Sequence, residues 1–224
     1  MKTKQVLTWH MPTPEMAHSE AGYQQLLHIW KTRWTSQGWD AAVVGMRHAR
    51  PHPFYKPLSS KVRTYPTSNG QNYEEGCWIR WLAAAECAKK LKGPVVMADS
   101  DVIPYNFHPE DTAGFDQDVH VLDRFGVPCM VYVTPEGAEH IASLAMSYNP
   151  PPGTTHVSDM HFFVEELVTH GFVHHGPWYC YQYGDNNFPD WRTAKAVHFS
   201  ASACRGQGQH KVSTVMAHVH GNIG

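Results

Sequence analysis

Hydrophobic residues in the first half of the chain follow two different periods. Short apolar runs at 4–9, 41–46 and 95–98 are typical of β-strands, and the last two read as fully buried. Between them, apolar residues at helical spacing predict helices over 19–37 and 71–92. The order is strand, helix, strand, helix, strand. This order predicts an α/β domain whose first strands lie parallel in one sheet.

Both predicted helices have an apolar stripe and a recognisable end. The stripes consist of Tyr23, Leu26, Leu27, Trp30 and Trp34 in the first helix and Trp78, Trp81, Leu82, Ala85, Ala88 and Leu91 in the second. Gly38 follows the first helix, and Gly93-Pro94 follows the second, which is the usual order of helix-ending residues. Asn72 and Glu75 have the spacing of a capping box at the start of the second helix.

The remaining segments predict a mixture of loops, strands and helices. Segment 47–70 is polar, contains four prolines and is predicted to be a long loop. Strands are expected near 119–122, 129–133 and 195–199, and a loop of small residues at 200–208. No element is predicted after this loop.

Two further helices have clear starts. Thr134-Pro135 has the pattern of an N-cap followed by proline in the first turn. Another helix is expected to start at Ser158 and to end at Gly171. Its inward face is predicted to consist of Met160, Phe163, Val164, Leu167 and Val168.

Length and composition restrict the class of protein. A chain of 224 residues with 42% hydrophobic and 17% charged residues fits one globular domain and not a disordered chain. A net charge of −2 gives no reason to expect nucleic-acid binding. No signal peptide is visible and no run approaches 18 apolar residues, so no membrane span is expected. The five cysteines lack CxxC spacing, which favours reduced thiols in a cytoplasmic protein.

Two aspartates directly follow the third predicted strand. Asp99 and Asp101 lie at its carboxyl end, where ligands bind in parallel α/β sheets. Alternate residues of an extended segment point to the same side, so the two carboxylates are expected to face one point. Mn²⁺ and Mg²⁺ favour carboxylate oxygen and keep positions open for phosphate oxygens. The segment therefore predicts a divalent-metal site for a diphosphate ligand.

The same spacing occurs a second time, at Asp116-Gln117-Asp118. No apolar strand precedes this copy, so it is predicted to be a solvated turn. The spacing alone is therefore a weak signal, and an aspartate pair in a turn is also the alternative for Asp99 and Asp101. The buried strand before Asp99 makes the first copy the stronger candidate.

Two segments resemble the GT-A glycosyltransferases. Residues 93–102, Gly-Pro-Val-Val-Met-Ala-Asp-Ser-Asp-Val after a long helix, resemble their DxD segment. Residues 196–200, Ala-Val-His-Phe-Ser, resemble the segment that closes the site in several metal-dependent members. The resemblance implies one GT-A-like domain with a mixed, mostly parallel central sheet flanked by helices. It implies that Asp101 and His198 ligate Mn²⁺ or Mg²⁺, that Asp99 contacts the metal or the donor ribose, and that Ser100 lies in the donor site.

The resemblance also marks candidates for binding the donor. Family members often follow the closing segment with Lys-Pro-Trp, whose lysine binds phosphate. This chain continues differently, with Ala-Ser-Ala-Cys-Arg-Gly at 201–206, and leaves Arg205 or Lys211 for that role. In this fold the nucleotide contacts the ends of the first two strands and the loop after the second. These positions are Trp9, His10 and Arg47, with Lys61 and Arg63 as further candidates.

Asp159 is the candidate catalytic base. Ser158-Asp159-Met160 is similar to an acidic element of GT-A enzymes that meets the acceptor hydroxyl, where a carboxylate can take its proton. The alternative is an ordinary helix start, because serine and aspartate are favoured there. His156 and His161 flank this element and are possible acceptor contacts. An aromatic platform for an acceptor is a further possibility at Trp178, Tyr181 and Tyr183, with core packing as its alternative.

The sequence thus favours a metal-dependent glycosyltransferase with a nucleotide-diphosphate donor and an unknown carbohydrate or other hydroxyl acceptor. Residues 1–104 are expected to form the nucleotide-binding half and 105–224 the acceptor side. The oligomeric state stays open. One alternative is a metal-dependent phosphohydrolase, for which His156, Asp159 and His161 are the tight further cluster. The other is a non-catalytic sugar-nucleotide-binding module on the same fold.

Overall fold

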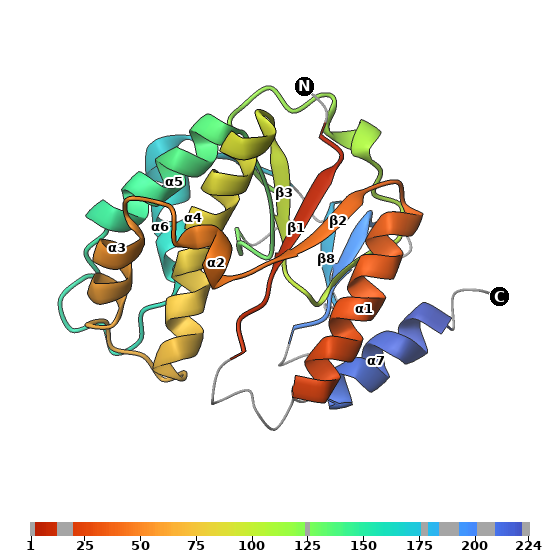
Figure 1. The fold of residues 1–224 in the computed structure, drawn as a ribbon, viewed down its shortest axis with the longest axis horizontal. Helices are drawn as coiled ribbons and strands as arrows, with labels where there is room; N and C mark the ends of the chain where they lie inside the picture. The colour runs from red at the N-terminus through yellow and green to blue at the C-terminus, as the bar shows by residue number, and fades with distance from the viewer. Residues whose placement is uncertain are drawn as a thin grey trace.

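The computed structural model describes residues 3–12, 20–123, 126–175, 179–183, 193–200 and 209–220. The main sheet has the order β2-β1-β3-β6-β5-β7, of which Figure 1 labels β1, β2 and β3, and a second sheet has the order β4-β9-β8. The main-sheet strands are β1 (Gln5–Trp9), β2 (Asp40–Val44), β3 (Val95–Ala98), β5 (Val119–Val121), β6 (Met130–Val133) and β7 (Val173–His174). The second sheet consists of β4 (Val102–Pro104), β8 (Cys180–Gln182) and β9 (Ala196–His198).

The main sheet is mixed but mostly parallel. Strands β2, β1 and β3 run parallel, which confirms the prediction for the first half of the chain. Strand β6 is antiparallel to both β3 and β5, and β7 is parallel to β5. The prediction that 41–46 is a fully buried strand was wrong. Strand β2 lies at the edge of the sheet, so Asp40 is exposed and Val43 is 37% exposed.

Helices cover both faces of the main sheet. Figure 1 shows α3, α4, α5 and α6 on one side and α1 and α7 on the other. The helices are α1 (Glu20–Ser36), α2 (Met46–Ala49), α3 (Tyr55–Val62), α4 (Gln71–Leu91), α5 (Pro135–Ser147), α6 (Asp159–His170) and α7 (Gln209–His220). No helix of the described ranges combines the length and the apolar character that a membrane crossing requires.

Side chains that alternate along the strands divide the core into two layers. In β1, Leu7 joins the cluster under α4 and α5, and Val6 joins the cluster under α1 and α7. In β3, Met97 belongs to the first cluster and Val96 to the second. Successive residues of a strand point to opposite faces, so a short apolar strand serves both layers. This explains why β3 has no polar position.

Segment 47–70 was predicted to be a loop, and this was wrong. It contains α2 and α3, and α3 buries Leu58 and Val62 against α4. Pro57 lies in the first turn of α3, where a missing amide hydrogen costs no helical hydrogen bond. The prolines of this segment therefore do not prevent helix formation.

Several helix ends were predicted correctly. Thr134 caps α5 through Gly137 N, and Ser158 caps α6, which ends at a left-handed Gly171. The capping box at Asn72 and Glu75 was wrong, because α4 follows Gly70 without a side-chain cap.

Three inward-facing positions were also predicted wrongly. Met160 and Val164 of α6 are 44% and 49% exposed, and Leu91 of α4 is 51% exposed. In α6, Phe163 is buried as predicted, together with Phe162, which was not predicted. The side chains of Leu167 and Val168 lie outside the described residues. Helix α7 was not predicted at all.

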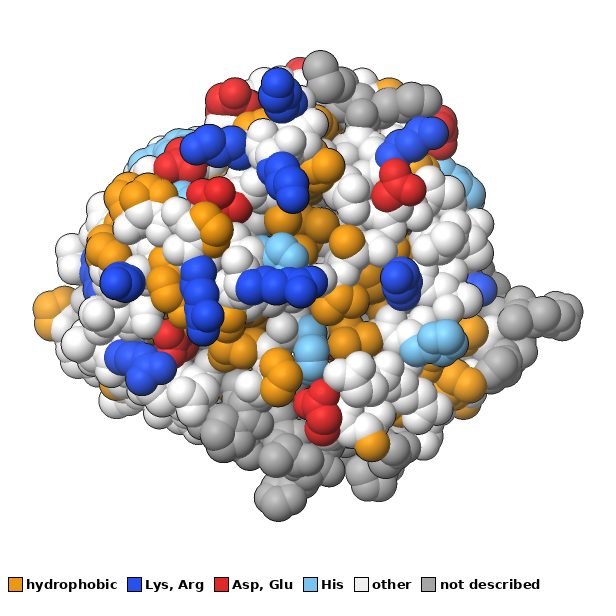
Figure 2. All heavy atoms as spheres, viewed as in Figure 1, with side chains coloured by type: hydrophobic (Ala, Val, Ile, Leu, Met, Phe, Trp, Pro, Cys, Tyr) orange, Lys and Arg blue, Asp and Glu red, His pale blue; other side chains and the backbone are white. Residues whose placement is uncertain are grey.

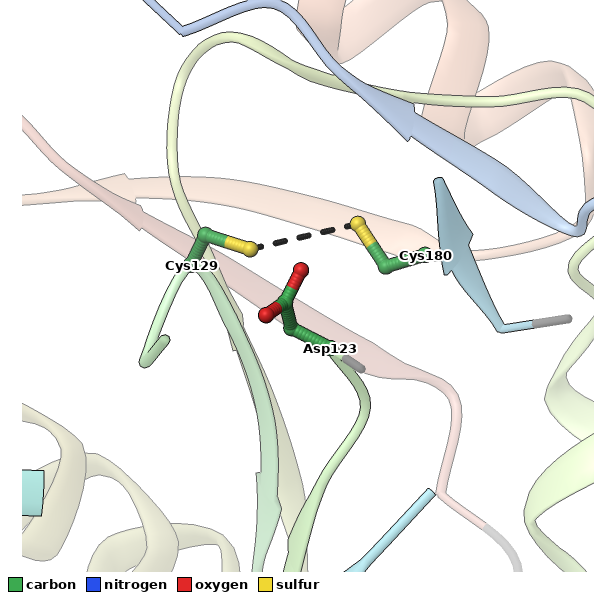
Figure 3. Close-up of side chains that lie close together, drawn as sticks. All are labelled: Asp123, Cys129 and Cys180. Carbon is green, nitrogen blue, oxygen red and sulfur yellow. Dashed lines mark hydrogen bonds between the residues drawn. The ribbon is translucent and has the colours of Figure 1, made fainter. Parts of the chain in front are cut away.

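A buried cluster joins the main sheet to the second sheet (Figure 3). Asp123, Cys129 and Cys180 are fully buried, and their ligand atoms lie within 4.8 Å of one another. The two Sγ atoms are 3.9 Å apart, about twice the ~2.05 Å of a disulfide bond, so both thiols are free. Gln182 Nε2 donates to Asp123 Oδ2 at 2.5 Å, and Val127 N donates to Oδ1 at 3.2 Å. These hydrogen bonds satisfy the carboxylate without a metal ion.

A buried histidine of β5 has a fixed protonation state. His120 is 2% exposed and stacks on Phe115 at 4.3 Å between ring centroids. Gln117 N donates to its Nε2 at 3.1 Å, so Nδ1 carries the proton and donates to His175 Nε2 at 2.8 Å. Burial, with a contribution from His175, lowers the pKa of His120 to about 4. The folded protein therefore holds this ring neutral.

We expect this histidine to make the folded state acid-sensitive. Its pKa is lower in the folded chain than the ordinary 6.5, so stability is present above pH 6.5 and is lost as the pH falls toward 4. The loss is at most about 3 kcal/mol. Urea unfolding across this range should show a weaker pH dependence for His120→Gln than for the wild type. The exposed His28→Gln should keep the wild-type dependence; equal slopes for all three proteins would contradict the prediction.

Candidate active site

Three predicted metal ligands come together where the two sheets meet. Asp99 follows β3, and Asp101 immediately precedes β4. Strand β9 pairs with β4 so that His198 lies opposite Val102, and Phe199 N donates to the Asp101 carbonyl at 2.9 Å. This register brings His198 beside the aspartates. One ligand atom from each of the three residues lies within 4.8 Å of the others.

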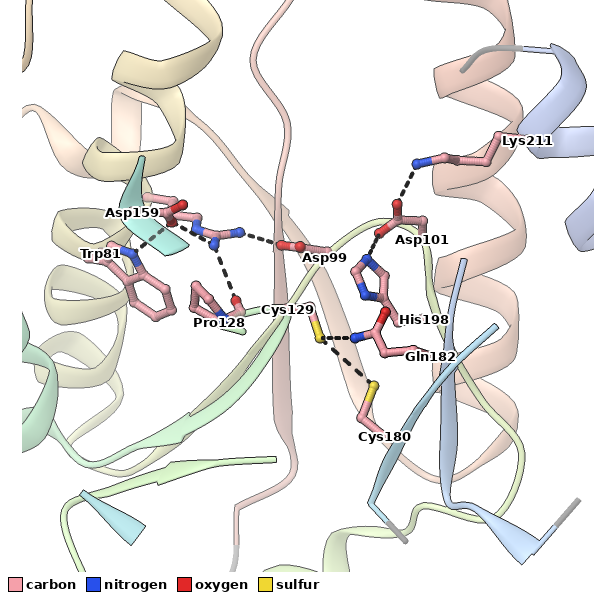
Figure 4. A network of polar contacts seen from close by, with 11 residues as sticks. Trp81, Asp99, Asp101, Pro128, Cys129, Asp159, Cys180, Gln182, His198 and Lys211 are labelled. Carbon is pink, nitrogen blue, oxygen red and sulfur yellow. Dashed lines mark hydrogen bonds and ion pairs between the residues drawn. The ribbon is translucent and has the colours of Figure 1, made fainter. Parts of the chain in front are cut away.

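The three residues fit a hard divalent cation. Two carboxylate oxygens and one imidazole nitrogen form a donor set that suits Mn²⁺ or Mg²⁺. His198 Nε2 points at Asp101 Oδ1 at 3.5 Å, as Figure 4 shows. Lys211 Nζ lies 2.5 Å from Asp101 Oδ2, and Arg80 forms an ion pair with Asp99. Side-chain cations therefore already approach both carboxylates at the place where a metal would bind.

Burial and neighbouring charges separate the two aspartates. Burial is the main cause that raises the pKa of Asp99 to about 6, and the nearby Asp101 carboxylate adds to the rise. Burial also acts to raise the pKa of Asp101, but Lys211 and His198 hold it well below its ordinary value. Burial opposes protonation of His198, yet Cys129 and Asp101 raise its pKa above the ordinary range. Asp101 is thus the firmly ionised member of the pair.

Arg80 connects Asp99 to Asp159 (Figure 4). It extends from α4 with 8% of its side chain exposed, and Nη2 donates to Asp159 Oδ2 at 2.7 Å and to the Pro128 carbonyl at 3.1 Å. Trp81 Nε1 also donates to Asp159 Oδ2, at 3.4 Å. The carboxylate of Asp159 is thus engaged by two donors, one of them cationic.

The sequence analysis did not identify Arg80. The residue lies within a run of buried α4 residues, where its neighbours Trp78 and Trp81 were interpreted as a core stripe. One signal was available, because a buried arginine requires acidic partners and this run contains no acid to pair with it.

One cleft of about 450 Å³ is lined by the charged groups of this network: Asp99, Asp101, His198, Lys211, Arg80 and Asp159. The predicted residues that line it are Trp9, His10, Asp99, Ser100, Asp101, Asp159, His198 and Lys211. They come from β1, the β3–β4 turn, α6, β9 and α7. The cleft therefore lies where the strands of both sheets end, as ligand sites of α/β sheets do.

Solved structures that this chain resembles include glycosyltransferases. One is a glycosyltransferase involved in the glycosylation of the major capsid of PBCV-1, with a TM-score of 0.58 and 10% identity over 95% of this chain and 98% of that chain. The chain has a GT-A-like fold. Another is mouse xyloside xylosyltransferase 1 in its apo form, with a TM-score of 0.51 and 11% identity over 90% and 99% of the two chains. No family model and no curated protein matches the sequence.

Within the GT-A-like fold, three candidate donor contacts do not line the cleft. Arg47 is exposed in α2. Figure 2, viewed as Figure 1, shows several Lys and Arg side chains on the face where Figure 1 labels α2. Lys61 Nζ donates to the Met146 carbonyl at 2.5 Å, and Arg63 pairs with Glu75. These three side chains do not reach the cleft because α2 and α3 form where a loop was expected, and the helices direct them away from it. Arg205 lies outside the described residues.

The aromatic acceptor platform is not supported either. Tyr181 is 7% exposed, and Tyr183 stacks on Phe199 at 4.9 Å between ring centroids, so the described tyrosines pack in the core of the GT-A-like fold. Trp178 lies outside the described residues. His156 and His161 do not line the cleft.

Several cleft residues near Asp159 were missed by the sequence analysis. They are Asn69, Tyr73, Glu74, Gly76 and Cys77. The first turns of α4 face the cleft. Polar residues of α4 that lie outside its apolar stripe could have marked this face of the helix as part of a site.

Proposed function

We propose that the protein is a metal-dependent glycosyltransferase that moves a sugar from a nucleotide-diphosphate donor to a hydroxyl acceptor. The observation that supports it most is the convergence of Asp99, Asp101 and His198 within 4.8 Å in the cleft of a GT-A-like fold. His198 follows the two aspartates by about 100 positions, and the three residues come from the ends of strands in both sheets. A chance aspartate pair in a turn does not require such a partner.

The residues of the cleft suggest a division of roles. Asp101 and His198 would hold Mn²⁺ or Mg²⁺, and Asp99 would contact the metal or the donor ribose. A bound metal supplies neutralisation of the charge that develops on the departing diphosphate. Lys211, already beside Asp101, is the described cation best placed to bind a phosphate oxygen. Trp9, His10 and Ser100 would complete the donor site.

Asp159 takes a different role from the one expected from the sequence. Its carboxylate accepts hydrogen bonds from Arg80 and Trp81 and forms a buried ion pair with Arg80, so it is already engaged by protein donors. We therefore assign Asp159 to holding Arg80 against Asp99. This assignment leaves the general base to another residue.

The phosphohydrolase alternative has less support. It needs a second metal cluster close to the first, for which His156, Asp159 and His161 were the candidates. Within the described part of the chain, these residues do not form a group of converging metal ligands. His156 Nδ1 instead accepts from Ser68 N at 3.1 Å, and Asp159 is paired with Arg80.

Incubation with a panel of nucleotide sugars and Mn²⁺ should release the matching nucleoside diphosphate from at least one donor. Release should stop when EDTA removes the metal, because the diphosphate would then lose its counter-charge. The measurement is chromatography of the nucleotide products with and without an acceptor mixture. Hydrolysis of simple phosphoesters without any donor turnover would contradict the proposal and favour a phosphohydrolase.

A further inference from the structure

Glu74 is a second carboxylate on the Asp159 side of the cleft. It lies in the first turn of α4, lines the cleft and is 2% exposed. Asn69 Nδ2 donates to its Oε1 at 2.5 Å. Its other oxygen, Oε2, is buried and has no hydrogen-bond partner among the described residues. Buried carboxylate oxygens without partners are unusual, because desolvation is not compensated.

The adjacent residue shows what a structural glutamate looks like in the same helix turn. Glu75 is 3% exposed, and both of its oxygens are satisfied. Ser59 Oγ donates to Oε1 at 2.5 Å, and Arg63 Nε donates to Oε2 at 2.8 Å. The Glu75 carboxylate therefore accepts from a cation and a hydroxyl. Among the described residues, the Glu74 carboxylate accepts from one side-chain amide. This contrast indicates that Glu74 is arranged for a ligand and not for the fold.

The neighbouring charges leave Glu74 available. Arg80 is the nearby cation, and it is committed to Asp99 and Asp159. Burial raises the pKa of Glu74, and the Asp159 carboxylate contributes in the same direction. A carboxylate in such surroundings is a stronger base than a solvated one. Asp159, in contrast, has its charge compensated by Arg80.

The surroundings also restrict the kind of molecule that can approach. Tyr73 and Met160 line the same cleft and are 40% and 44% exposed, so they offer apolar surface at its mouth. The cleft lining has four carboxylates and three cationic groups, an excess of carboxylates: Glu74, Asp99, Asp101 and Asp159 against Arg80, Lys211 and His198, whose pKa is raised. This disfavours an anionic acceptor. An uncharged hydroxyl compound with an apolar or flat face fits best.

We propose that Glu74 binds the nucleophilic hydroxyl of an uncharged acceptor at Oε2 and receives its proton during transfer. This inference rests on the proposed glycosyltransferase function. The acceptor oxygen forms a bond to the anomeric carbon while the bond from that carbon to the diphosphate oxygen breaks. The electron pair of the broken bond leaves with the diphosphate, and the hydroxyl proton passes to Glu74.

The test compares Glu74→Gln with Glu75→Gln in the full chain. The probes are p-nitrophenyl glycosides as uncharged acceptors and p-nitrophenyl glucuronide as an anionic one, with the active donor and Mn²⁺. Glu74→Gln should lower kcat for transfer by about 100-fold or more and leave Mn²⁺-dependent nucleoside diphosphate binding within about twofold. Its Tm should not fall, because an uncompensated buried charge is removed. Glu75→Gln should retain transfer, and the glucuronide should be the poorer acceptor.

Three outcomes would overturn the proposal. Full transfer by Glu74→Gln would exclude the role, and loss of nucleotide binding in the same variant would show a structural effect. Absence of donor turnover by the wild type would overturn the glycosyltransferase function itself, and the role of Glu74 with it. If Glu74→Gln does not fold, Asn69→Ala keeps the carboxylate but removes its fixed orientation. That variant should raise the KM for the acceptor and leave the KM for the donor unchanged; an unchanged acceptor KM would count against the proposal.

Discussion

Asp101→Ala is expected to weaken Mn²⁺-dependent nucleotide binding by at least about 100-fold, beyond what loss of a supporting contact causes. Asp101 is the residue that His198 and Lys211 both approach, and it is the firmly ionised aspartate of the pair. Without it, Lys211 faces the site without its ion-pair partner, and Asp99 is the one carboxylate left in the group of three candidate ligands. Calorimetric titration with Mn²⁺ and a series of nucleoside diphosphates measures the effect.

The chain provides its own control for this experiment. Asp116 belongs to the second Asp-x-Asp and is exposed, as the sequence analysis predicted. Asp118 of the same copy accepts from Thr134 Oγ1 at 2.7 Å and so helps to form the turn before α5. Asp116→Ala should leave metal-dependent binding unchanged. Unchanged binding by Asp101→Ala would place the metal site elsewhere.

Arg80→Met is expected to lower the free energy of unfolding by about 3–5 kcal/mol, the range for breaking a buried ion pair from one side. The substitution leaves Asp159, with 4% of its side chain exposed, and Asp99, with 30%, without their cation. It also removes the hydrogen bond to the Pro128 carbonyl. Urea unfolding measures the loss, and adding Asp159→Asn to Arg80→Met should recover part of it.

An exposed ion pair is the matched comparison. Lys195 Nζ lies 2.7 Å from Asp111 Oδ1, with 28% and 22% of the two side chains exposed. Lys195→Met should cost no more than about 1 kcal/mol, because solvent screens such pairs. If Arg80→Met cost no more than Lys195→Met, the bridge between Asp99 and Asp159 would not support the fold.

The three candidate metal ligands could be selected from the sequence because each follows a local rule. Asp99 and Asp101 follow a strand without polar positions. His198 lies in a short apolar strand, within the segment that resembles the closing segment of GT-A glycosyltransferases. Their meeting was not predictable from spacing. It depends on the pairing of β4 with β9, a contact between residues almost 100 positions apart.

Arg80, Glu74 and Lys211 are cleft residues whose roles depend on partners from elsewhere in the fold. A charged side chain in a helix is interpreted as solvent-facing unless its partner is known, and the partners of Arg80 come from the β3–β4 turn and α6. Lys211 was considered as a phosphate ligand. The helix that carries it, α7, was not predicted from the sequence. The burial of β2 was predicted wrongly for the same reason. Whether a strand lies at the edge of a sheet depends on the other strands and not on its own residues.

The position of β9 has a consequence for the order in which the proposed metal site can form during synthesis. His198 is supplied near the end of the described chain and reaches Asp101 only through the second sheet. A nascent chain that has folded α1, α4 and the parallel strands still has two carboxylates without the imidazole. High-affinity metal binding should therefore appear only after residues 196–198 have emerged and paired with β4. In a refolding experiment, recovery of metal affinity would report this late, long-range step separately from the recovery of helical signal.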